Sequence, residues 1–274
     1  MMQYIYKFEA MTTPCEVILF AADKSKADAV ATLILQEVKR LEKKYNYFDP
    51  SSYLSELNSR KIQDLDLETM DVLRRSLLYY KQTNKIFDIT IGTLKDIYKN
   101  AQTLDEVEEQ KSFLMPFTGC EHIKINKKKL YFDNKYTKID LGGFIKEYAV
   151  DRAVKIIRKA KIPSAIVNFG GDVYALGKKP NGDKFTIGIK DPHNTNEFKL
   201  FVTIENQALT TSASYERNYT IQNSSFSHII TKGSLDETVN SVSVISTNCV
   251  ESGIFSTAIM IDSSLKTKNK VIIL

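Results

Sequence analysis

The stretch 138–172, KIDLGGFIKEYAVDRAVKIIRKAKIPSAIVNFGGD, decides the fold of the chain. Alternating apolar residues predict a strand over residues 137–141 that leads into it. Apolar residues then recur at helical spacing, which predicts a helix over residues 144–160. Pro163 ends this helix, and a β-branched run predicts a second strand over residues 165–169. A strand, a helix and a strand are therefore expected at the centre of the fold.

Glycine pairs stand where both expected strands end. Gly142-Gly143 precedes the helix, and Gly170-Gly171 precedes Asp172. Glycine lets the backbone approach a ligand closely, and a helix N-terminus offers free N–H groups, so both corners could bind phosphate. Such turns also occur in loops that bind nothing. The spacing matches neither GxGxxG nor GxxxxGK[ST], so a phosphate site here would be of another kind.

The composition is that of a globular chain with a full core. The 274 residues are 43% hydrophobic and carry a formal charge of +5, which suits an anionic ligand without identifying one. The run Lys127-Lys128-Lys129 is expected to be a solvated turn, because no stripe of basic and aromatic residues accompanies it as in a nucleic-acid site. The three cysteines contain no CxxC pair, so they are expected to be small buried residues.

The remaining pattern mixes long helices with short strands. A strongly amphipathic helix is expected over residues 24–45, with shorter helices near 54–58, 68–82 and 251–261. The second half is mostly β in pattern. This mixture favours an α+β fold over a doubly wound sheet, and we expect one domain over residues 1–274, made of one unit or of two intimately joined subdomains.

Several single residues could carry chemistry, and each has a plainer interpretation. Phe48 is either part of the core or a platform for a flat ring. Asp88 lies in an apolar run, so backbone donors or a ligand must satisfy it. His228 suits general-base work but could be an ordinary strand histidine. The run 210–212, Thr-Thr-Ser, is expected to be a hydroxyl-rich turn, either a phosphate or ribityl donor or a plain loop. Thr257 lies on the last expected helix, where a threonine hydroxyl usually bonds its own backbone.

Nine motifs occur in the order and approximate spacing of one known family. They are MTTP, FDPSSYLSELN, FDITIGTL, KIDLGGFIKEYAVDRA, VNFGGDVYALG, IGIKDP, TTSASYER, HII and FSTAI. They extend over nearly the whole chain, and the combination of DLGGxxK, YAxD and NFGGD is the specific part. The sequence therefore resembles the ApbE-type FAD:protein FMN transferases.

The resemblance implies a T-fold-like α+β structure whose two joined subdomains hold the flavin in the cleft between them. Members of the family cut the pyrophosphate of FAD with Mg²⁺ and pass FMN to a threonine or serine hydroxyl of a target protein, releasing AMP. The implied partners are FAD and an acceptor protein with a Thr/Ser flavinylation motif, and no nucleic acid.

The resemblance also assigns roles to residues. The residues expected to line the FAD site are Met11, Phe48, Phe87, Asp88, Ile89, Asp140, Lys146 and Ile230. Gly143 would offer a carbonyl and Thr257 a hydroxyl to the metal. His228 would be the base that takes the proton from the acceptor hydroxyl.

The chain departs from the family at the metal site. The family's metal-binding aspartate, four residues before the threonine, is Gly253 here, and the glycine of the family's KGY motif is Glu147. Mg²⁺ prefers hard oxygen ligands, so losing a carboxylate should weaken the site. Two interpretations follow. Either Glu147 or Glu251 replaces the lost carboxylate, or the chain binds FAD but has lost efficient transfer and at most slowly hydrolyses FAD to FMN and AMP.

The sequence contains no basic segment followed by an apolar core and no window of 18 apolar residues. It therefore predicts no transmembrane segment and, as written, a cytoplasmic chain. Members of the family often work in the periplasm or anchored to the membrane.

Overall fold

The computed structural model describes residues 1–213, 218–221, 224–227 and 239–274. Its helices are α1 (Lys24–Tyr45), α2 (Tyr53–Asn58), α3 (Leu67–Gln82), α4 (Gly92–Asn100), α5 (Leu104–Leu114), α6 (Gly142–Lys159) and α7 (Cys249–Ile261), with 3-10 turns η1 (Ile89–Ile91), η2 (Met115–Phe117) and η3 (Cys120–His122). Its strands are β1 (Met2–Ala10), β2 (Thr13–Ala21), β3 (Ile123–Asn126), β4 (Lys129–Phe132), β5 (Ser164–Phe169), β6 (Asp172–Leu176), β7 (Phe185–Asp191), β8 (Asn194–Ile204), β9 (Gln207–Ala213), β10 (Asn218–Ile221), β11 (Ser224–Ser227), β12 (Ser241–Ser246) and β13 (Lys270–Ile273).

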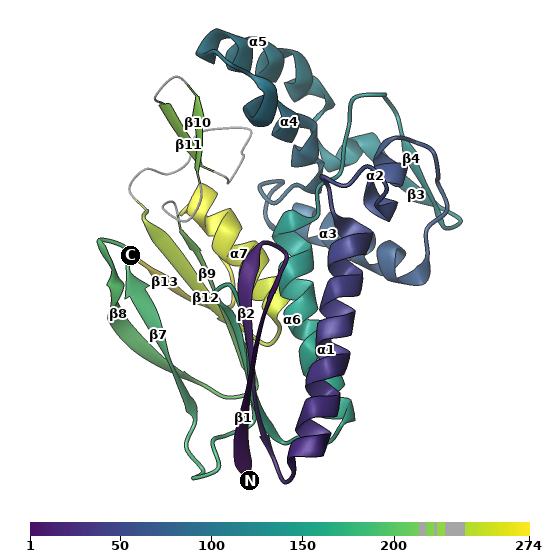
Figure 1. Cartoon of the computed structure of the whole chain (residues 1–274). Helices are drawn as coiled ribbons and strands as arrows, with labels where there is room; N and C mark the ends of the chain where they lie inside the picture. Colours follow the sequence, from purple (N-terminus) through teal and green to yellow (C-terminus); the bar gives the residue numbers. More distant parts are fainter. Residues whose placement is uncertain (214–217, 222–223, 228–238) are drawn as a thin grey trace.

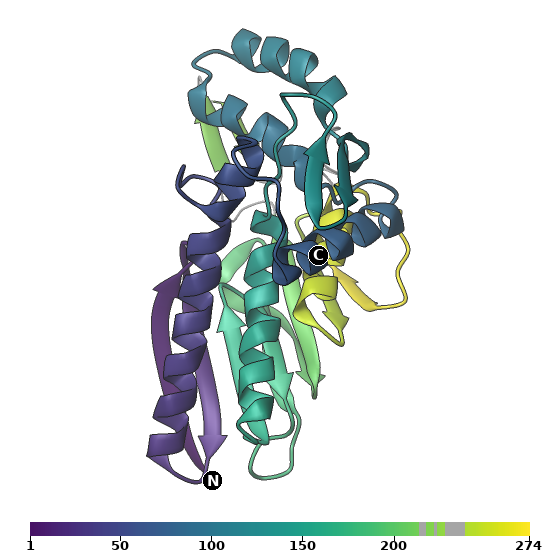
Figure 2. The ribbon, with the colours of Figure 1, turned by 90° about the vertical axis from the view of Figure 1, so that its right-hand side faces the viewer.

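In the described part of the chain, seven strands form one sheet in the order β1-β2-β5-β6-β9-β12-β13. All neighbouring pairs are antiparallel. Helices α1 and α6 run side by side along one face of the sheet, next to α7 (Figures 1 and 2). This arrangement confirms the α+β class, because the strands pair antiparallel instead of alternating with helices in a parallel sheet.

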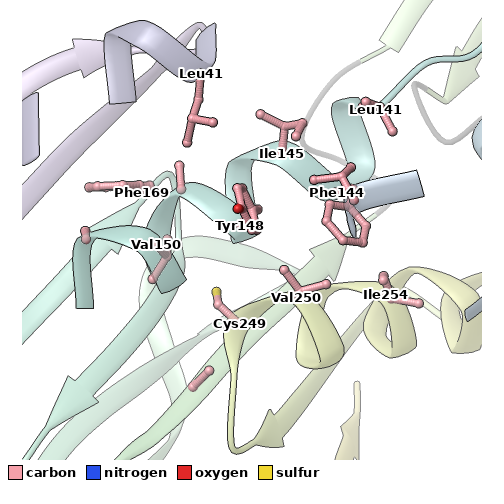
Figure 3. Packing of buried hydrophobic residues seen from close by; sticks show 14 of the residues in the cluster. Leu41, Leu141, Phe144, Ile145, Tyr148, Val150, Phe169, Cys249, Val250 and Ile254 are labelled. Carbon is pink, nitrogen blue, oxygen red and sulfur yellow. The ribbon is translucent and has the colours of Figure 1, made fainter. Parts of the chain in front are cut away.

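The two faces of the sheet are buried by different partners. Side chains of the helices fill one face, where Phe144 and Phe169 are among the largest fully buried residues (Figure 3). The β7–β8 hairpin covers the other face, and its Phe185 and Ile204 pack against Phe20 of the sheet. The cysteines are buried, as expected, and Cys249, the first residue of α7, lies in the core (Figure 3).

The helices begin where the sequence supplies caps. Asp23 accepts a hydrogen bond from the Lys26 N–H at 2.8 Å and starts α1, whose buried face includes Val30 and Ile34. The range predicted for this helix is therefore confirmed. The turn predicted at the lysine run is also confirmed, because it joins β3 to β4 with Lys127 and Lys128 at positive φ.

The strand predicted over residues 137–141 is wrong. These residues are alternately buried, but they pair with no strand among the described residues. Asn58 takes the place of a strand partner. Its Nδ2 donates to the carbonyl of Ile139 at 2.8 Å, and its Oδ1 accepts from the Ile139 N–H at 2.7 Å. Thr93 accepts from the Lys138 N–H in the same way, at 3.0 Å.

Two further boundaries differ from the prediction. Helix α6 begins at Gly142, so the first glycine pair forms the first turn of the helix and does not precede it. The residues of the predicted turn at 210–212 belong to strand β9, which pairs with β6 and β12. Their hydroxyls bond α7 and β12. Among the described residues, no helix is long and apolar enough to cross a lipid bilayer.

Candidate active site

A deep cleft of about 2320 Å³ lies at the ends of several elements. It is bordered by the β1–β2 turn, the first turn of α6, the β5–β6 turn, the end of β9 and the β7–β8 hairpin. Its lining includes nine of the residues predicted for the site: Met11, Phe48, Phe87, Asp88, Ile89, Asp140, Gly143, Lys146 and Thr257. The other two, His228 and Ile230, lie outside the described residues.

The second glycine corner requires glycine at both positions. Gly170 has φ +60°, and a Cβ there would meet Thr13 Oγ1 at 2.1 Å. Gly171 has φ +93°, and a Cβ there would meet no atom within 4 Å. Gly170 thus lets the β5–β6 turn close against the β1–β2 hairpin, while Gly171 leaves open space on the cleft.

The two-residue β1–β2 turn presents Met11 to the cleft. Ala10 pairs with Thr13, and both turn residues, Met11 and Thr12, have positive φ (52° and 58°). This is the geometry of a type I′ hairpin turn, which residues other than glycine and asparagine seldom adopt. The Met11 N–H donates to the carboxylate of Glu42 on α1, which fixes the turn against the helix.

Phe48 is 56% exposed, so its interpretation as a core residue is wrong. The Lys95 ammonium lies 4.7 Å from the centroid of its ring, and the Tyr47 ring packs edge-on against it at 5.4 Å. Lys95 also pairs with Asp140 at 2.6 Å, and Asp140 accepts from the Gly142 N–H at 3.0 Å. The N-terminus of α6, Lys95 and the Phe48 ring therefore lie next to one another at the wall of the cleft.

Asp88 is buried, and its Oδ1 atom is bonded by its own turn. Its Oδ1 accepts from the Thr90 N–H at 2.8 Å and from the Thr90 hydroxyl at 2.6 Å, and the Cys120 thiol lies 3.3 Å away. The Thr90 hydroxyl in turn accepts from the Gly119 N–H at 2.7 Å. Asp88 therefore holds the cleft wall formed by residues 87–91 in place.

A buried charge cluster lies where α6 meets β6. Lys146 Nζ is 2.7 Å from Asp172 Oδ2, and the Asp172 side chain is only 2% exposed. Glu147, 6% exposed, lies beside this pair. Burial and the neighbouring Asp172 charge raise the pKa of Glu147, and Lys146 opposes this only in part. Burial likewise raises the pKa of Asp172. The cluster thus contains two carboxyl groups and one ammonium group.

Sequence reasoning missed Asp172 as a site residue. A signal was present, because Asp172 opens an otherwise apolar strand, DVYAL, and an unpaired buried carboxylate is costly. The cost of burying a carboxylate in an apolar run had already identified Asp88 as a candidate site residue.

Hydroxyl groups link β9 to α7 beside the cluster. Ser212 Oγ lies 2.9 Å from Ser256 Oγ and 3.1 Å from Thr257 Oγ1. Thr210 Oγ1 lies 2.8 Å from Ser252 Oγ. These contacts orient the exposed side of Thr257 towards the cleft.

A hard divalent cation fits this part of the cleft by the chemistry of its donors. The described residues contain no group of three His, Cys, Asp or Glu side chains that could hold a metal by themselves. Gly143, Glu147 and Thr257 line the cleft and carry a carbonyl, a carboxyl and a hydroxyl group. Mg²⁺ accepts such a mixed set of oxygen ligands together with water.

The fold and the cleft define an α+β protein in which, among the described residues, an exposed aromatic ring, two glycine corners and oxygen-bearing side chains border one large cleft. The family model described as "ApbE family" matches residues 11–270, and the chain belongs to this family.

Curated relatives carry the name FAD:protein FMN transferase. The protein from Klebsiella pneumoniae is 23% identical and aligns over 99% of this chain and 91% of its own length. The one from Chlamydia pneumoniae is 27% identical over 95% of this chain and 85% of its own. Among solved structures, the ApbE protein from Thermotoga maritima superposes with a TM-score of 0.88 at 22% identity, covering 99% of this chain and 94% of its own. The flavin transferase ApbE from Vibrio cholerae gives 0.81 at 19% identity, covering 99% and 97%. These superpositions confirm the expected fold.

Proposed function

We propose that the protein is an FAD:protein FMN transferase that uses Mg²⁺. A hydroxyl oxygen of a threonine or serine in a target protein forms a bond to the flavin-side phosphorus of FAD. The bond from that phosphorus to the bridging oxygen breaks, AMP leaves, and the hydroxyl proton passes to a base. The observation that carries the proposal is that nine of the eleven predicted site residues border one cleft, in a chain that belongs to the ApbE family.

The cleft suits both reactants. Its volume of about 2320 Å³ exceeds the roughly 300–1,000 Å³ of a typical small-molecule pocket, so an acceptor loop could enter beside a dinucleotide. Phe48 would stack on a flat ring, while Lys146 and the glycine corners would face the diphosphate. Phosphoryl transfer depends mainly on such positioning and charge neutralisation.

Gly143 and Thr257 would hold Mg²⁺ through a carbonyl and a hydroxyl. When bound, the cation would neutralise charge on the diphosphate. Asp140 would act through Lys95 and the α6 N-terminus, because it contacts both. His228, outside the described residues, is the proposed base. Replacing it with alanine should lower the transfer rate by about 10²–10⁴-fold while leaving FAD affinity within about twofold.

A second candidate is FAD binding without transfer, and the glycine at position 253 favours it. One experiment separates the two. The protein is incubated with FAD, Mg²⁺ and a peptide that carries a threonine or serine flavinylation motif, and AMP and covalently bound flavin are measured. AMP together with yellow peptide supports transfer. Tight FAD binding without AMP at any Mg²⁺ concentration overturns it, and AMP without labelled peptide indicates hydrolysis only.

A further inference from the structure

The two departures from the family motif meet in space. A Cβ atom placed on Gly253 would lie 2.5 Å from Cγ of Glu147 and 3.0 Å from its Cδ and Oε1. Non-bonded carbon atoms pack at about 3.5–4.0 Å, so in this arrangement the two positions cannot both carry a long side chain. Glu147 therefore fills the space in which a side chain at position 253 would begin.

The Glu147 carboxyl group is buried beside a second carboxyl group. The side chain is 6% exposed, and its carboxyl group hydrogen-bonds that of Asp172, while no other described donor bonds its Oε2 atom. The ammonium of Lys146 is 2.7 Å from Asp172. Among the described residues, the carboxyl groups of Glu147 and Asp172 thus lie together beside this ammonium. A carboxyl group on the cleft can serve as an oxygen ligand, and a bound divalent cation would favour its charged form.

Helical spacing brings the other oxygen donors close. Gly143 and Glu147 are four residues apart on α6, and Gly253 and Thr257 are four residues apart on α7, so each pair shares one face of its helix. The contact between Glu147 and Gly253 brings these two faces together. Gly143, Glu147 and Thr257 all line the cleft.

The other candidate carboxylate is engaged elsewhere. Glu251 Oε2 lies 3.3 Å from Asn248 Nδ2, and Glu251 Oε1 lies 3.2 Å from Asn269 Nδ2. Glu251 does not line the cleft.

We propose that Glu147 supplies, from α6, the carboxylate ligand that the divalent-cation site lacks at position 253. The metal site of this chain has then been rebuilt from the opposite helix and has not been lost. The inference rests on the proposed function only for the identity of the cation, because the buried carboxylate and its contact with α7 exist whatever the cleft binds.

The test measures binding of Mn²⁺, an oxygen-preferring stand-in for Mg²⁺ whose free form is visible by electron paramagnetic resonance. Mn²⁺ is titrated with and without FAD into the wild-type protein and the Glu147→Gln variant, which keeps the side-chain shape. We expect Glu147→Gln to weaken Mn²⁺ binding by about tenfold or more. The matched control is Glu251→Gln, which removes a carboxylate outside the cleft and should stay within about twofold.

A swap of the carboxylate tests the geometry. Gly253→Asp alone should clash with Glu147 and lower thermal stability. Glu147→Ala combined with Gly253→Asp removes this clash, and its new aspartate supplies a carboxylate to the cation site from α7. The double variant should bind Mn²⁺ within about threefold of wild type, and Glu147→Ala alone should not. Alanine is used at position 147 because glycine would weaken the helix by about 1 kcal/mol.

Three results would overturn the inference: wild-type affinity in Glu147→Gln, no Mn²⁺ binding by the wild-type protein with or without FAD, or no recovery in the double variant. A separate measurement distinguishes failure of the Glu147 proposal from failure of the proposed function. FAD binding is followed by quenching of flavin fluorescence in EDTA. If the wild-type protein fails to bind FAD, the proposed function falls while the Mn²⁺ titrations still decide the role of Glu147.

Discussion

Replacement of Asn58 by leucine should remove the support of the segment that leads into the cleft. Asn58 is 9% exposed, and its side chain makes two hydrogen bonds to the backbone of the fully buried Ile139. Leucine has a similar volume but bonds neither group, so one N–H and one C=O would be buried without partners. Each orphaned group costs about 1–3 kcal/mol, so the free energy of unfolding should fall by about 2–6 kcal/mol.

Urea denaturation followed by circular dichroism measures this change, and hydrogen exchange reports whether the Ile139 amide opens. Asn58→Asp tests the two hydrogen bonds separately. Aspartate can still accept from the Ile139 N–H, but its second oxygen faces the Ile139 carbonyl and cannot donate to it when ionised. It should be strongly destabilising at pH 7 and less so in acid, where the protonated carboxyl can donate. Ser59→Ala, at the exposed neighbouring position, should change stability by no more than about 0.5 kcal/mol. A loss below about 1 kcal/mol in Asn58→Leu would refute the role assigned to this side chain.

Three other outcomes are expected. Burial opposes ionisation of Glu68, but hydrogen bonds from Arg40 and a neighbouring lysine outweigh it and lower its pKa to about 2, from 4.5. Because the folded-state pKa is the lower one, Glu68→Gln should cost about 1–2 kcal/mol above pH 4.5, after allowance for solvent screening, and the difference in urea midpoints should vanish as the pH falls towards 2. Gly170→Ala should destabilise by about 2 kcal/mol or more in thermal unfolding, because backbone strain adds to the clash with Thr13, whereas Gly171→Ala should cost about 1–2 kcal/mol from strain alone. EDTA should stop release of AMP from FAD, measured by chromatography, and excess Mg²⁺ should restore it.

The parts of the fold that the sequence predicted are those whose signals are local. Helix α1 was predicted to the residue from its long amphipathic face, and the aspartate cap and terminal lysines seen in the structure agree with those ends. The segment 137–141 was misassigned because alternating burial indicates an extended chain but not what pairs with it. Its partner, Asn58, lies 81 residues from Ile139 in the sequence.

The candidate site shows the same limit. The motifs brought together the residues that border the cleft, but the pairing of Lys146 with Asp172 and the contacts of Ser212 with α7 depend on how distant elements pack. Whether Phe48 is buried also depends on packing, because an aromatic residue in a turn-rich loop fits a core and a platform equally well.

The missing aspartate illustrates why a motif is better assessed in three dimensions. In the sequence, Gly253 indicates only a loss, and a chain that had simply lost its metal would be expected to fill the space with an apolar side chain or leave it empty. Instead, a glutamate occupies the position where the family motif has glycine, and its buried side chain packs against Gly253 on the cleft. A buried carboxylate destabilises a fold that gains nothing from it, since an apolar residue of similar size would pack there at lower cost. Its presence at the one position that compensates the glycine therefore argues for an exchange of ligand between two helices and against decay of the site.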